Sequence, residues 1–298
     1  KSYGRVREGV VMKYQFIAEH AQEYSVRRQC QVLEVAASGY YAWLQSEPSL
    51  RQQADKALLS EIQAIYQQNR RLYGSPRIHA ELHKRGWRCS RKRVARLMRQ
   101  AHLASVRQRR QRVQTTDSKH PYPVAANVLD RQFEAQRPNQ KWVSDITYIP
   151  TQQGWLYLAA VLDLFSRKIV GWAMSACCDA SLVQNALQMA LVQRQPTADL
   201  LHHSDRGSQY AAHAYQALLA QHHITVSMSR KGNCYDNAAM ESFFRTLKAE
   251  CVDLHVFQSH HLARSIIFEF LEVYYNRQRL HSTLAYCTPA AFEAAFFL

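Results

Sequence analysis

The stretch Asn237-Ala-Ala-Met-Glu-Ser-Phe-Phe-Arg-Thr-Leu-Lys248 is the segment around which the rest of this chain is organised. At 100° per residue, the large apolar side chains in and just after it fall on one arc, which comprises Met240, Phe243, Phe244, Leu247, Cys251 and Leu254. Glu241, Arg245 and Lys248 fall together on the opposite side. The pattern predicts a helix that docks on a core and presents one carboxylate with two cations beside it.

Upstream of this helix, the sequence changes at about residue 140 to a strand pattern. Trp142-Val-Ser-Asp-Ile-Thr-Tyr-Ile149 is rich in β-forming residues, and Pro150 ends it. Two more strands follow after short turns, so we expect an antiparallel meander. A helix through Leu191, a strand at 200–204, a helix at about 211–221 and a strand at 224–228 complete the pattern. The order predicts an α/β fold: a ribonuclease-H-like catalytic core with a mixed five-stranded sheet.

Three acidic residues occupy separate elements of this predicted core: Asp145 on the first strand, Asp205 at the end of the fourth, and Glu241 on the helix. In-line attack at a phosphodiester needs an activated nucleophile and a stabilised leaving oxygen, which two Mg²⁺ ions roughly 3.5–4 Å apart supply. Mg²⁺ prefers hard oxygen ligands. We expect Asp145 to bridge two Mg²⁺ ions, with Asp205 and Glu241 each holding one, and Mn²⁺ to substitute.

Other acidic residues of the core have simpler interpretations. Asp163 lies in a turn between strands and is expected to be structural, and Asp179 or Ser181 is expected to cap the following helix. Asp236 and Asn237 are good N-cap residues for the Glu241 helix, although Asp236 is also the alternative third metal ligand.

The histidines form no complete metal set in the sequence. His79 and His83 have the HxxxH spacing of a zinc site, but no CxxC motif accompanies them, so an exposed helix surface is the preferred interpretation. His202 or His203 is expected to border the active site, because Asp205 follows so closely.

The residues before the core are predicted to be helical. Residues 13–45 indicate a helix, a turn and a second helix capped by Ser38, either a small helix-turn-helix or a simple packing hairpin. A second unit has helices at about 51–69, 77–84 and 91–100, with Pro76 and Ser90 at the starts of the last two.

The third helix of that unit, 91–100, is strongly basic. Val94, Leu97 and Met98 are expected to face inward, which leaves the cations largely outside: Arg91, Lys92, Arg93, Arg96 and Arg99. A major-groove reader needs such a helix, because its first residues meet base edges while flanking cations hold phosphates. A solvated basic face is the alternative.

The charge of the chain points to a polyanionic partner. The 298 residues contain 38 Lys and Arg against 23 Asp and Glu, a net charge of +15. Between Arg77 and Arg112 there are 13 basic residues and one acid, Glu81. This concentration is typical of a nucleic-acid footprint, and residues 107–123 read as a basic linker along a phosphate backbone. We also expect DNA contacts from Arg230, Lys231, Arg245 and Lys248.

The remaining composition is that of a globular intracellular protein. The seven cysteines are odd in number and irregularly spaced, which indicates free thiols in a reducing compartment. The longest apolar run, 154–162, is too short to cross a bilayer, and no signal peptide opens the chain. We expect a cytoplasmic, nucleoid-associated protein without a membrane partner. Because the only plausible initiator is Met12, we expect a missing or fused upstream part.

Several motifs together resemble the IS-three family of insertion-sequence transposases, bacterial relatives of retroviral integrases. They are Trp142–Tyr148, Leu162–Arg167, His203–Tyr210, Ser227–Ala238, Glu241–Phe244 and Tyr275–Leu284, with the Tyr73-Gly-Ser-Pro-Arg-Ile helical unit. The resemblance runs from about residue 12 to the C-terminus.

The resemblance implies that Asp145, Asp205 and Glu241 are a DDE triad, followed seven positions later by the basic Lys248. It implies cleavage and transfer of strands at inverted-repeat ends of double-stranded DNA, typically through a circular intermediate, and joining to target DNA by a homo-oligomer. The family's upstream frame supplies a further helix-turn-helix and a coiled coil, which are not seen here. A retroviral-type integrase and a DNA-binding regulator with an inactive core are the alternatives; the missing CxxC and the intact triad disfavour them.

The expected domains follow from these boundaries. They are an N-terminal helical segment (1–48), a helix-turn-helix DNA-binding domain (49–106), a basic linker (107–136), the ribonuclease-H-like core (137–252) and a C-terminal helical extension (253–298).

Overall fold

The computed structural model of the chain describes residues 9–45, 49–105, 121–197, 199–231 and 233–298. The chain divides into two compact units, residues 1–64 and 65–298. In the described part of the first unit, α1 (Val10–Glu19), α2 (Val26–Val32) and α3 (Ala37–Gln45) enclose a small buried core of Ile17, Cys30 and Tyr40.

The first unit corrects two expectations for residues 13–45. Three helices are present where two were predicted, because the chain turns at residues 20–25 between α1 and α2. Ser38 does not cap α3, because the carbonyl of Ala36 already accepts a hydrogen bond from the Tyr40 N–H, and the first turn therefore begins before Ser38.

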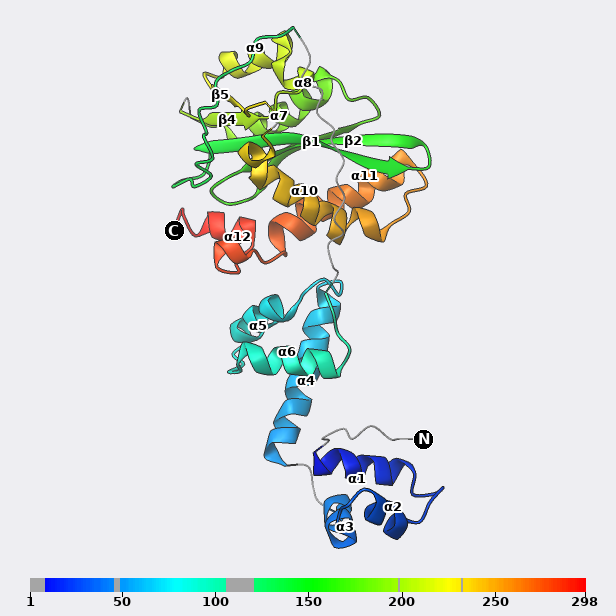
Figure 1. Cartoon of the computed structure of the whole chain (residues 1–298). Helices are drawn as coiled ribbons and strands as arrows, with labels where there is room; N and C mark the ends of the chain where they lie inside the picture. Colours follow the sequence, from blue (N-terminus) through cyan, green and yellow to red (C-terminus); the bar gives the residue numbers. More distant parts are fainter. Residues whose placement is uncertain (1–8, 46–48, 106–120, 198, 232) are drawn as a thin grey trace. The chain divides into compact units, whose positions relative to one another are not determined.

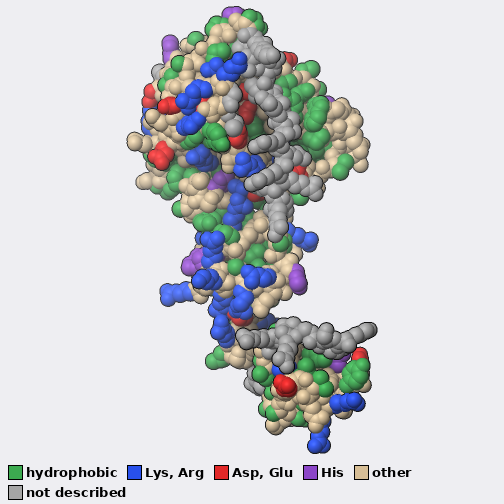
Figure 2. All heavy atoms as spheres, viewed as in Figure 1, with side chains coloured by type: hydrophobic (Ala, Val, Ile, Leu, Met, Phe, Trp, Pro, Cys, Tyr) green, Lys and Arg blue, Asp and Glu red, His purple; other side chains and the backbone are tan. Residues whose placement is uncertain are grey.

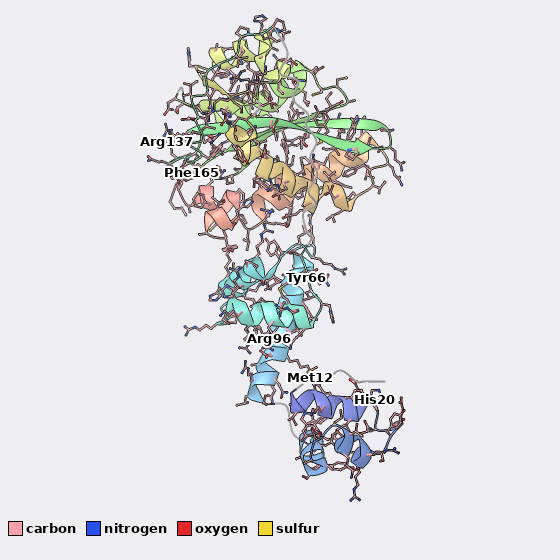
Figure 3. All side chains as sticks on the ribbon, viewed as in Figure 1. Met12, His20, Tyr66, Arg96, Arg137 and Phe165 are labelled. Carbon is pink, nitrogen blue, oxygen red and sulfur yellow. The ribbon has the colours of Figure 1, made fainter. Side chains whose placement is uncertain are left out.

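The predicted helices of the basic unit are confirmed as α4 (Leu50–Gln68), α5 (Ser75–Lys84) and α6 (Arg91–Gln100). Pro76 stands in the first turn of α5. The Ser90 side chain caps α6 by accepting a hydrogen bond from the Arg93 N–H. The predicted inward face of α6 is confirmed, since Val94, Leu97 and Met98 are buried. Lys and Arg side chains gather over α5 and α6 in Figure 2, and Arg96 lies on α6 in Figure 3.

The core of the second unit is a mixed five-stranded sheet of order β3-β2-β1-β4-β5, as predicted. Its strands are β1 (Lys141–Thr151), β2 (Gly154–Asp163), β3 (Ile169–Ser175), β4 (Leu201–Ser204) and β5 (Thr225–Met228). The first three form the expected antiparallel meander, and β4 and β5 run parallel to β1.

Alternation along β1 sends its side chains to opposite faces of the sheet. Val143 and Ile149 join the core beneath α10 (Ala238–Glu250) and α11 (His260–Glu269). Trp142 and Ile146 join the core on the other face, beneath α7 (Ala180–Arg194) and α9 (His213–Gln221). The short α8 (Ser208–Ala211) follows β4. Figure 1 shows these two helical layers on either side of the sheet.

The C-terminal segment is part of the core. The stretch predicted as a C-terminal helical extension contains α11 with a π-helical continuation, Phe270–Tyr275, and α12 (Pro289–Ala294). The Asn276 side chain pairs with both the N–H and the C=O of Ile169, at 2.9 Å each, and so completes the edge of β3. Glu293 of α12 forms ion pairs with Lys168 and Arg194. Among the described residues, no helix is both long and apolar enough to span a membrane.

Candidate active site

Asp145 lies in the middle of β1, where it pairs with Ala160 of β2. Strand alternation places its side chain on the face that α10 covers, the same face as Val143. The carboxylate is partly buried, and its Oδ1 accepts a hydrogen bond from the Ile146 N–H at 2.8 Å. The central strand therefore holds a carboxylate where an apolar residue would be expected.

Asp205 follows directly after β4, the parallel neighbour of β1. In this pair Trp142 lies opposite His202 and Val143 opposite His203, so continuing the register brings Asp205 beside Asp145. The Asp205 Oδ1 accepts a hydrogen bond from the Gly207 N–H at 2.9 Å, which fixes the turn after the strand. The structure thus brings together two of the three predicted carboxylates, on adjacent strands.

Glu241 lies in the first turn of α10. Just before this helix, the buried Asn237 donates a hydrogen bond from Nδ2 to the Ser144 carbonyl at 3.2 Å, which ties the helix start to β1 one residue before Asp145. The predicted apolar arc is confirmed for Met240, Phe243, Phe244, Leu247 and Cys251, all buried. Leu254 is 50% exposed, because α10 ends at Glu250 and the following 3₁₀ turn rotates it outward.

The electrostatics show that these carboxylates act on one another. The pKa of Asp145 is raised well above its ordinary value, first by burial and then by the negative charges of Asp205 and Glu241. The Ile146 N–H and the Lys248 ammonium oppose this rise. Burial also raises the pKa of Glu241, against the opposing charge of Arg245. Lys248 therefore lies within electrostatic reach of the carboxylates.

The donor chemistry of this site fits a divalent cation. Carboxylate oxygens are the ligands that Mg²⁺ prefers, and a cation would offset the repulsion that raises the Asp145 pKa. In the described parts of the chain, however, no three His, Cys, Asp or Glu side chains are gathered closely enough to hold a metal ion. The fit therefore rests on donor type and charge, with Asp145, Asp205 and Glu241 as the candidate ligands.

The two histidines before Asp205 are buried. His202 Nε2 lies 2.8 Å from Ser144 Oγ and 3.2 Å from the Tyr215 hydroxyl. Burial lowers the pKa of His202 to about 3 and that of His203 to about 4, so both are neutral at neutral pH. They border the proposed site, and their side-chain contacts join β4 to the neighbouring strands β1 and β5.

Comparison with known proteins agrees with this geometry. Family models of the integrase core domain match residues 135–234 and 222–289, and a model of an HTH-like domain matches residues 52–111. The chain is 43% identical over 284 residues to the transposase InsF for insertion sequence IS3A of Escherichia coli (strain K12), which covers 95% of this chain and 98% of that protein. The chain belongs to the IS-three family of insertion-sequence transposases.

Two further similarities were found. The insertion element IS600 uncharacterized 31 kDa protein of Shigella sonnei is 46% identical over 267 residues, which is 90% of this chain and 98% of that protein. Among solved structures, the simian T-cell lymphotropic virus intasome in complex with PP2A regulatory subunit B56 gamma aligns with a TM-score of 0.45 at 15% identity, over 72% of this chain and 69% of that one. Family membership makes this chain a transposase of the integrase-core type, and the two kinds of domain support DNA binding.

The other acidic residues of this transposase take up structural positions. Asp163 is fully buried, accepts hydrogen bonds from the Asn139 and Phe165 N–H groups and pairs with Arg194, which confirms a structural role. Asp179 caps α7 as expected, by accepting a hydrogen bond from the Leu182 N–H.

The expectation that Asp236 caps α10 is wrong. It is fully buried, and its carboxylate accepts hydrogen bonds from Asn127, Arg131 and Arg230. Its pKa is held far below the ordinary value, chiefly by its hydrogen bonds to Arg230. Asn237 occupies the cap position of α10, with no side-chain cap bond.

The histidines with zinc-like spacing also contact protein atoms. His79 Nε2 and His83 Nε2 lie 3.0 and 3.4 Å from the Cys89 carbonyl oxygen. No metal cluster includes them among the described residues.

The predicted DNA contacts of the transposase differ in accessibility. Side chains that stand exposed on the surface are Arg91, Lys92, Arg99, Lys231 and Arg245, while Arg93, Arg96 and Lys248 are partly buried. Arg230 is exposed but forms ion pairs with Asp236 and Asp130.

Three positions around Asp236 and α10 were missed from the sequence: Asn127, Arg131 and the Asn237 anchor on Ser144. Asn127 and Arg131 sit in the stretch taken as a linker, and no local pattern marks them as partners of a residue more than 100 positions away.

Proposed function

We propose that this transposase cleaves and joins DNA strands at insertion-sequence ends with Asp145, Asp205 and Glu241 as its catalytic carboxylates and metal ligands. The observation that carries the proposal is geometric: the register of adjacent parallel strands brings Asp205 beside Asp145, and the Asn237–Ser144 hydrogen bond ties the start of the Glu241 helix to the same strand. The raised pKa of Asp145, caused by burial and by the charges of Asp205 and Glu241, agrees with this placement. The three acids lie on three elements and repel one another across a partly buried site. Without a cation, this repulsion lowers the stability of the folded chain. That cost favours a functional over a structural role.

In this proposal each element has one task. When bound, two divalent ions would activate the attacking oxygen and stabilise the leaving oxygen, with Mg²⁺ as the natural ion and Mn²⁺ as a substitute. Asp145 would supply oxygens to both ions, with Asp205 and Glu241 each holding one. The anchored start of α10 keeps Glu241 on the Asp145 side of the sheet. Lys248 would hold the DNA strand beside the scissile phosphate.

The basic helix α6 would recognise DNA. Its cap places Arg91, Lys92 and Arg93 at the helix start, where a major-groove reader contacts bases and phosphates. Arg96 and Arg99 would contact phosphates further along, and Lys231 and Arg245 would do so beside the core. Arg230 would contact DNA only while it keeps its ion pair with Asp236. The partners would be inverted-repeat ends and target DNA, bound by a homo-oligomer associated with the nucleoid.

The proposed domain limits remain those of the sequence: 1–48, 49–106, 107–136, 137–252 and 253–298. The second half of the linker, from residue 121, is described and includes the partners of Asp236.

The test is cleavage of a labelled oligonucleotide that carries an insertion-sequence end, with Mg²⁺ or Mn²⁺. Asp145→Asn, Asp205→Asn and Glu241→Gln should each reduce cleavage and joining by about 1,000-fold or more, since each loses charge stabilisation worth several kcal/mol. All three should stay folded and bind the end. Asp253→Asn, a change at an exposed acid in the turn after α10, should cleave normally. Robust cleavage by any triad variant would remove that residue from the site.

A further inference from the structure

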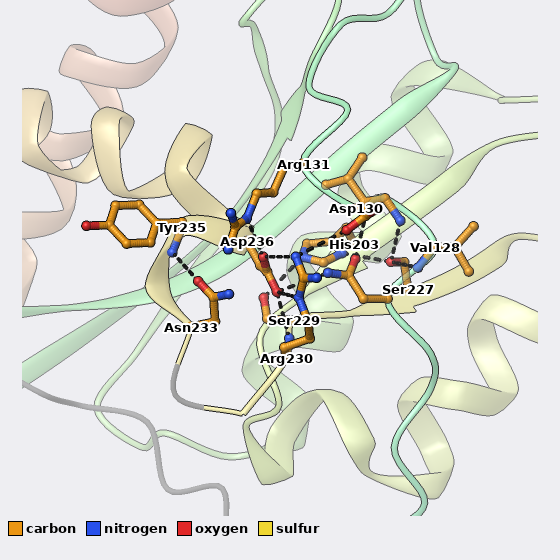
Figure 4. A network of polar contacts seen from close by, with 12 residues as sticks. Val128, Asp130, Arg131, His203, Ser227, Ser229, Arg230, Asn233, Tyr235 and Asp236 are labelled. Carbon is orange, nitrogen blue, oxygen red and sulfur yellow. Dashed lines mark hydrogen bonds and ion pairs between the residues drawn. The ribbon is translucent and has the colours of Figure 1, made fainter.

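The Asp236 carboxylate is held by an unusually complete set of donors (Figure 4). Its Oδ1 accepts hydrogen bonds from Arg131 Nε at 3.0 Å and Arg230 Nη2 at 2.8 Å. Its Oδ2 accepts from Asn127 Nδ2 at 3.0 Å and from the backbone N–H and Nε of Arg230, both at 2.9 Å. One fully buried side chain thus joins three stretches: residues 127–131, the loop at residue 230 and the 3₁₀ turn that leads into α10.

Asp236 is fully buried while its partner Arg230 is about half exposed, and burying a charged group to form an ion pair is rarely the best way to gain stability. Removing charges from water costs several kcal/mol per ion, and a well-packed apolar group of similar size is often as stable. What a bidentate guanidinium–carboxylate pair adds is directional geometry. The pair of Asp236 and Arg230 therefore fixes the loop at residue 230 against the start of α10, and the bonds from Asn127 and Arg131 to the same carboxylate fix residues 127–131 against it.

A second set of hydrogen bonds fixes residues 127–131 to the strands. The Ser227 hydroxyl oxygen of β5 accepts bonds from the backbone N–H groups of residues 128–129, at 2.9 and 3.0 Å. Its own proton must then go to His203 Nδ1, 2.8 Å away. His203 consequently carries its proton on Nε2 and donates to Ser229 Oγ, at 3.1 Å, which donates to the Ser204 carbonyl.

Residues 127–131 are consequently tied to both halves of the proposed site. Through Ser227 and His203 they are fixed to the ends of β4 and β5, next to Asp205. Through Asp236 they are fixed to the start of α10, five residues before Glu241.

We propose that Asp236 is a positioning residue for Glu241: it clamps the start of α10 to residues 127–131 and so sets the distance from Glu241 to Asp145 and Asp205. The inference rests on the proposed role of the three carboxylates. Asn237 anchors the same turn to β1, so the helix start is held from two directions, by Asn237 on the sheet and by Asp236 on the linker side.

The test uses the full chain and measures Mn²⁺ binding by calorimetry, the thermal midpoint and end cleavage at saturating DNA. Asp236→Asn keeps the shape of the side chain but sets an NH₂ group against guanidinium donors. It should weaken Mn²⁺ binding about tenfold and lower the cleavage rate at least tenfold; saturating DNA keeps any change in the DNA contact of Arg230 out of the measured rate. Asp163→Asn is the matched control, because Asp163 is an equally buried carboxylate paired with Arg194 that makes no bond to α10. It should lower the thermal midpoint and leave Mn²⁺ affinity unchanged.

A second variant separates position from charge. Arg131→Gln removes a cation, so by electrostatics alone it would strengthen Mn²⁺ binding, whereas loosening the clamp weakens it. Because Arg131 is about half exposed, Arg131→Gln is expected to fold, and it therefore tests the positioning role even if Asp236→Asn fails to fold. Arg131→Lys keeps the charge but not the directed Nε bond, so its Mn²⁺ affinity should lie between those of the wild type and Arg131→Gln.

The outcomes separate the inference from the function on which it rests. Wild-type Mn²⁺ affinity and cleavage in folded Asp236→Asn, or tighter Mn²⁺ binding in Arg131→Gln, would overturn the positioning role while leaving the triad standing. If Glu241→Gln itself binds Mn²⁺ and cleaves normally, the proposed function fails, and the positioning role fails with it.

Discussion

Replacing Asp145 by Asn should make the metal-free protein more stable while it abolishes activity. Burial and the negative charges of Asp205 and Glu241 raise the pKa of Asp145, so the ionised form of this carboxylate opposes folding. Asn keeps the oxygen that accepts the Ile146 N–H bond and removes the charge.

The size of the effect follows from the strand pairing. Side chains at neighbouring positions of paired strands lie about 6 Å apart, and two unit charges at that distance repel by about 3 kcal/mol at an effective dielectric constant of 20. Lys248 offsets part of this repulsion. A net gain of about 2 kcal/mol is expected, which for a unit of this size raises the thermal midpoint by about 4–8 °C.

The assay is thermal unfolding of wild type and Asp145→Asn with a chelator and with excess Mg²⁺. The native state holds the Asp145 proton more tightly than the unfolded chain, so its stability falls as pH rises from the ordinary value of 3.8 through the raised pKa. The advantage of the variant should be absent near pH 4, grow as the pH rises, and be full once the pH exceeds the raised pKa of Asp145. Mg²⁺ should stabilise the wild type and leave the variant nearly unchanged. An equal or lower midpoint for the variant in chelator at neutral pH would refute the reasoning.

Three further predictions follow from other parts of the chain. Lys248→Ala should keep the fold and Mn²⁺ affinity but reduce strand transfer, while Lys248→Arg retains most activity because a phosphate clamp needs charge more than shape; cleavage rates and crosslinking from position 248 to end DNA check both. Replacing Arg91 and Arg93 by Ala should weaken end binding and reduce its salt slope by about 1 per lost phosphate contact, as fluorescence anisotropy at several salt concentrations would show; an unchanged slope supports a solvated face. Gly171→Ala should cost at least about 3 kcal/mol, because the added methyl would lie 2.7 Å from the Ala190 Cβ and closer still to a carbonyl oxygen of α7, and a denaturant titration measures the loss.

Much of the fold follows from local patterns in the sequence. The β-rich run at 142–149 and the turns after it predict the meander, because alternation and turn residues act over a few positions. The inward face of α6 and the caps at Ser90 and Asp179 are likewise local, and all are confirmed. The predicted apolar face of α10 is buried as far as Cys251. Leu254 is exposed, because the 3₁₀ turn there changes the rotation from one residue to the next.

The candidate site was predictable in its residue types but not in its supports. Carboxylates in a strand, at a strand end and on a helix stand out, because a core rarely places charge there without a function. The residues that hold these strands and this helix in place show no comparable pattern in the sequence. The partner of Asn276 is the backbone of Ile169, a contact that any residue at position 169 could make.

The sequence by itself determined most of the elements, most of the faces they bury and the three candidate acids, since each depends on spacing within one helix or strand. Only the tertiary structure decided the role of Asp236, which local rules made a helix cap. Two of its partners, Asn127 and Arg131, lie 109 and 105 residues away in the chain, and the third, Arg230, lies six residues before it. A buried charge is satisfied by whichever donors the folded chain brings to it, and that choice depends on the packing of the whole sheet and its helices as well as on the neighbours of Asp236 in the sequence.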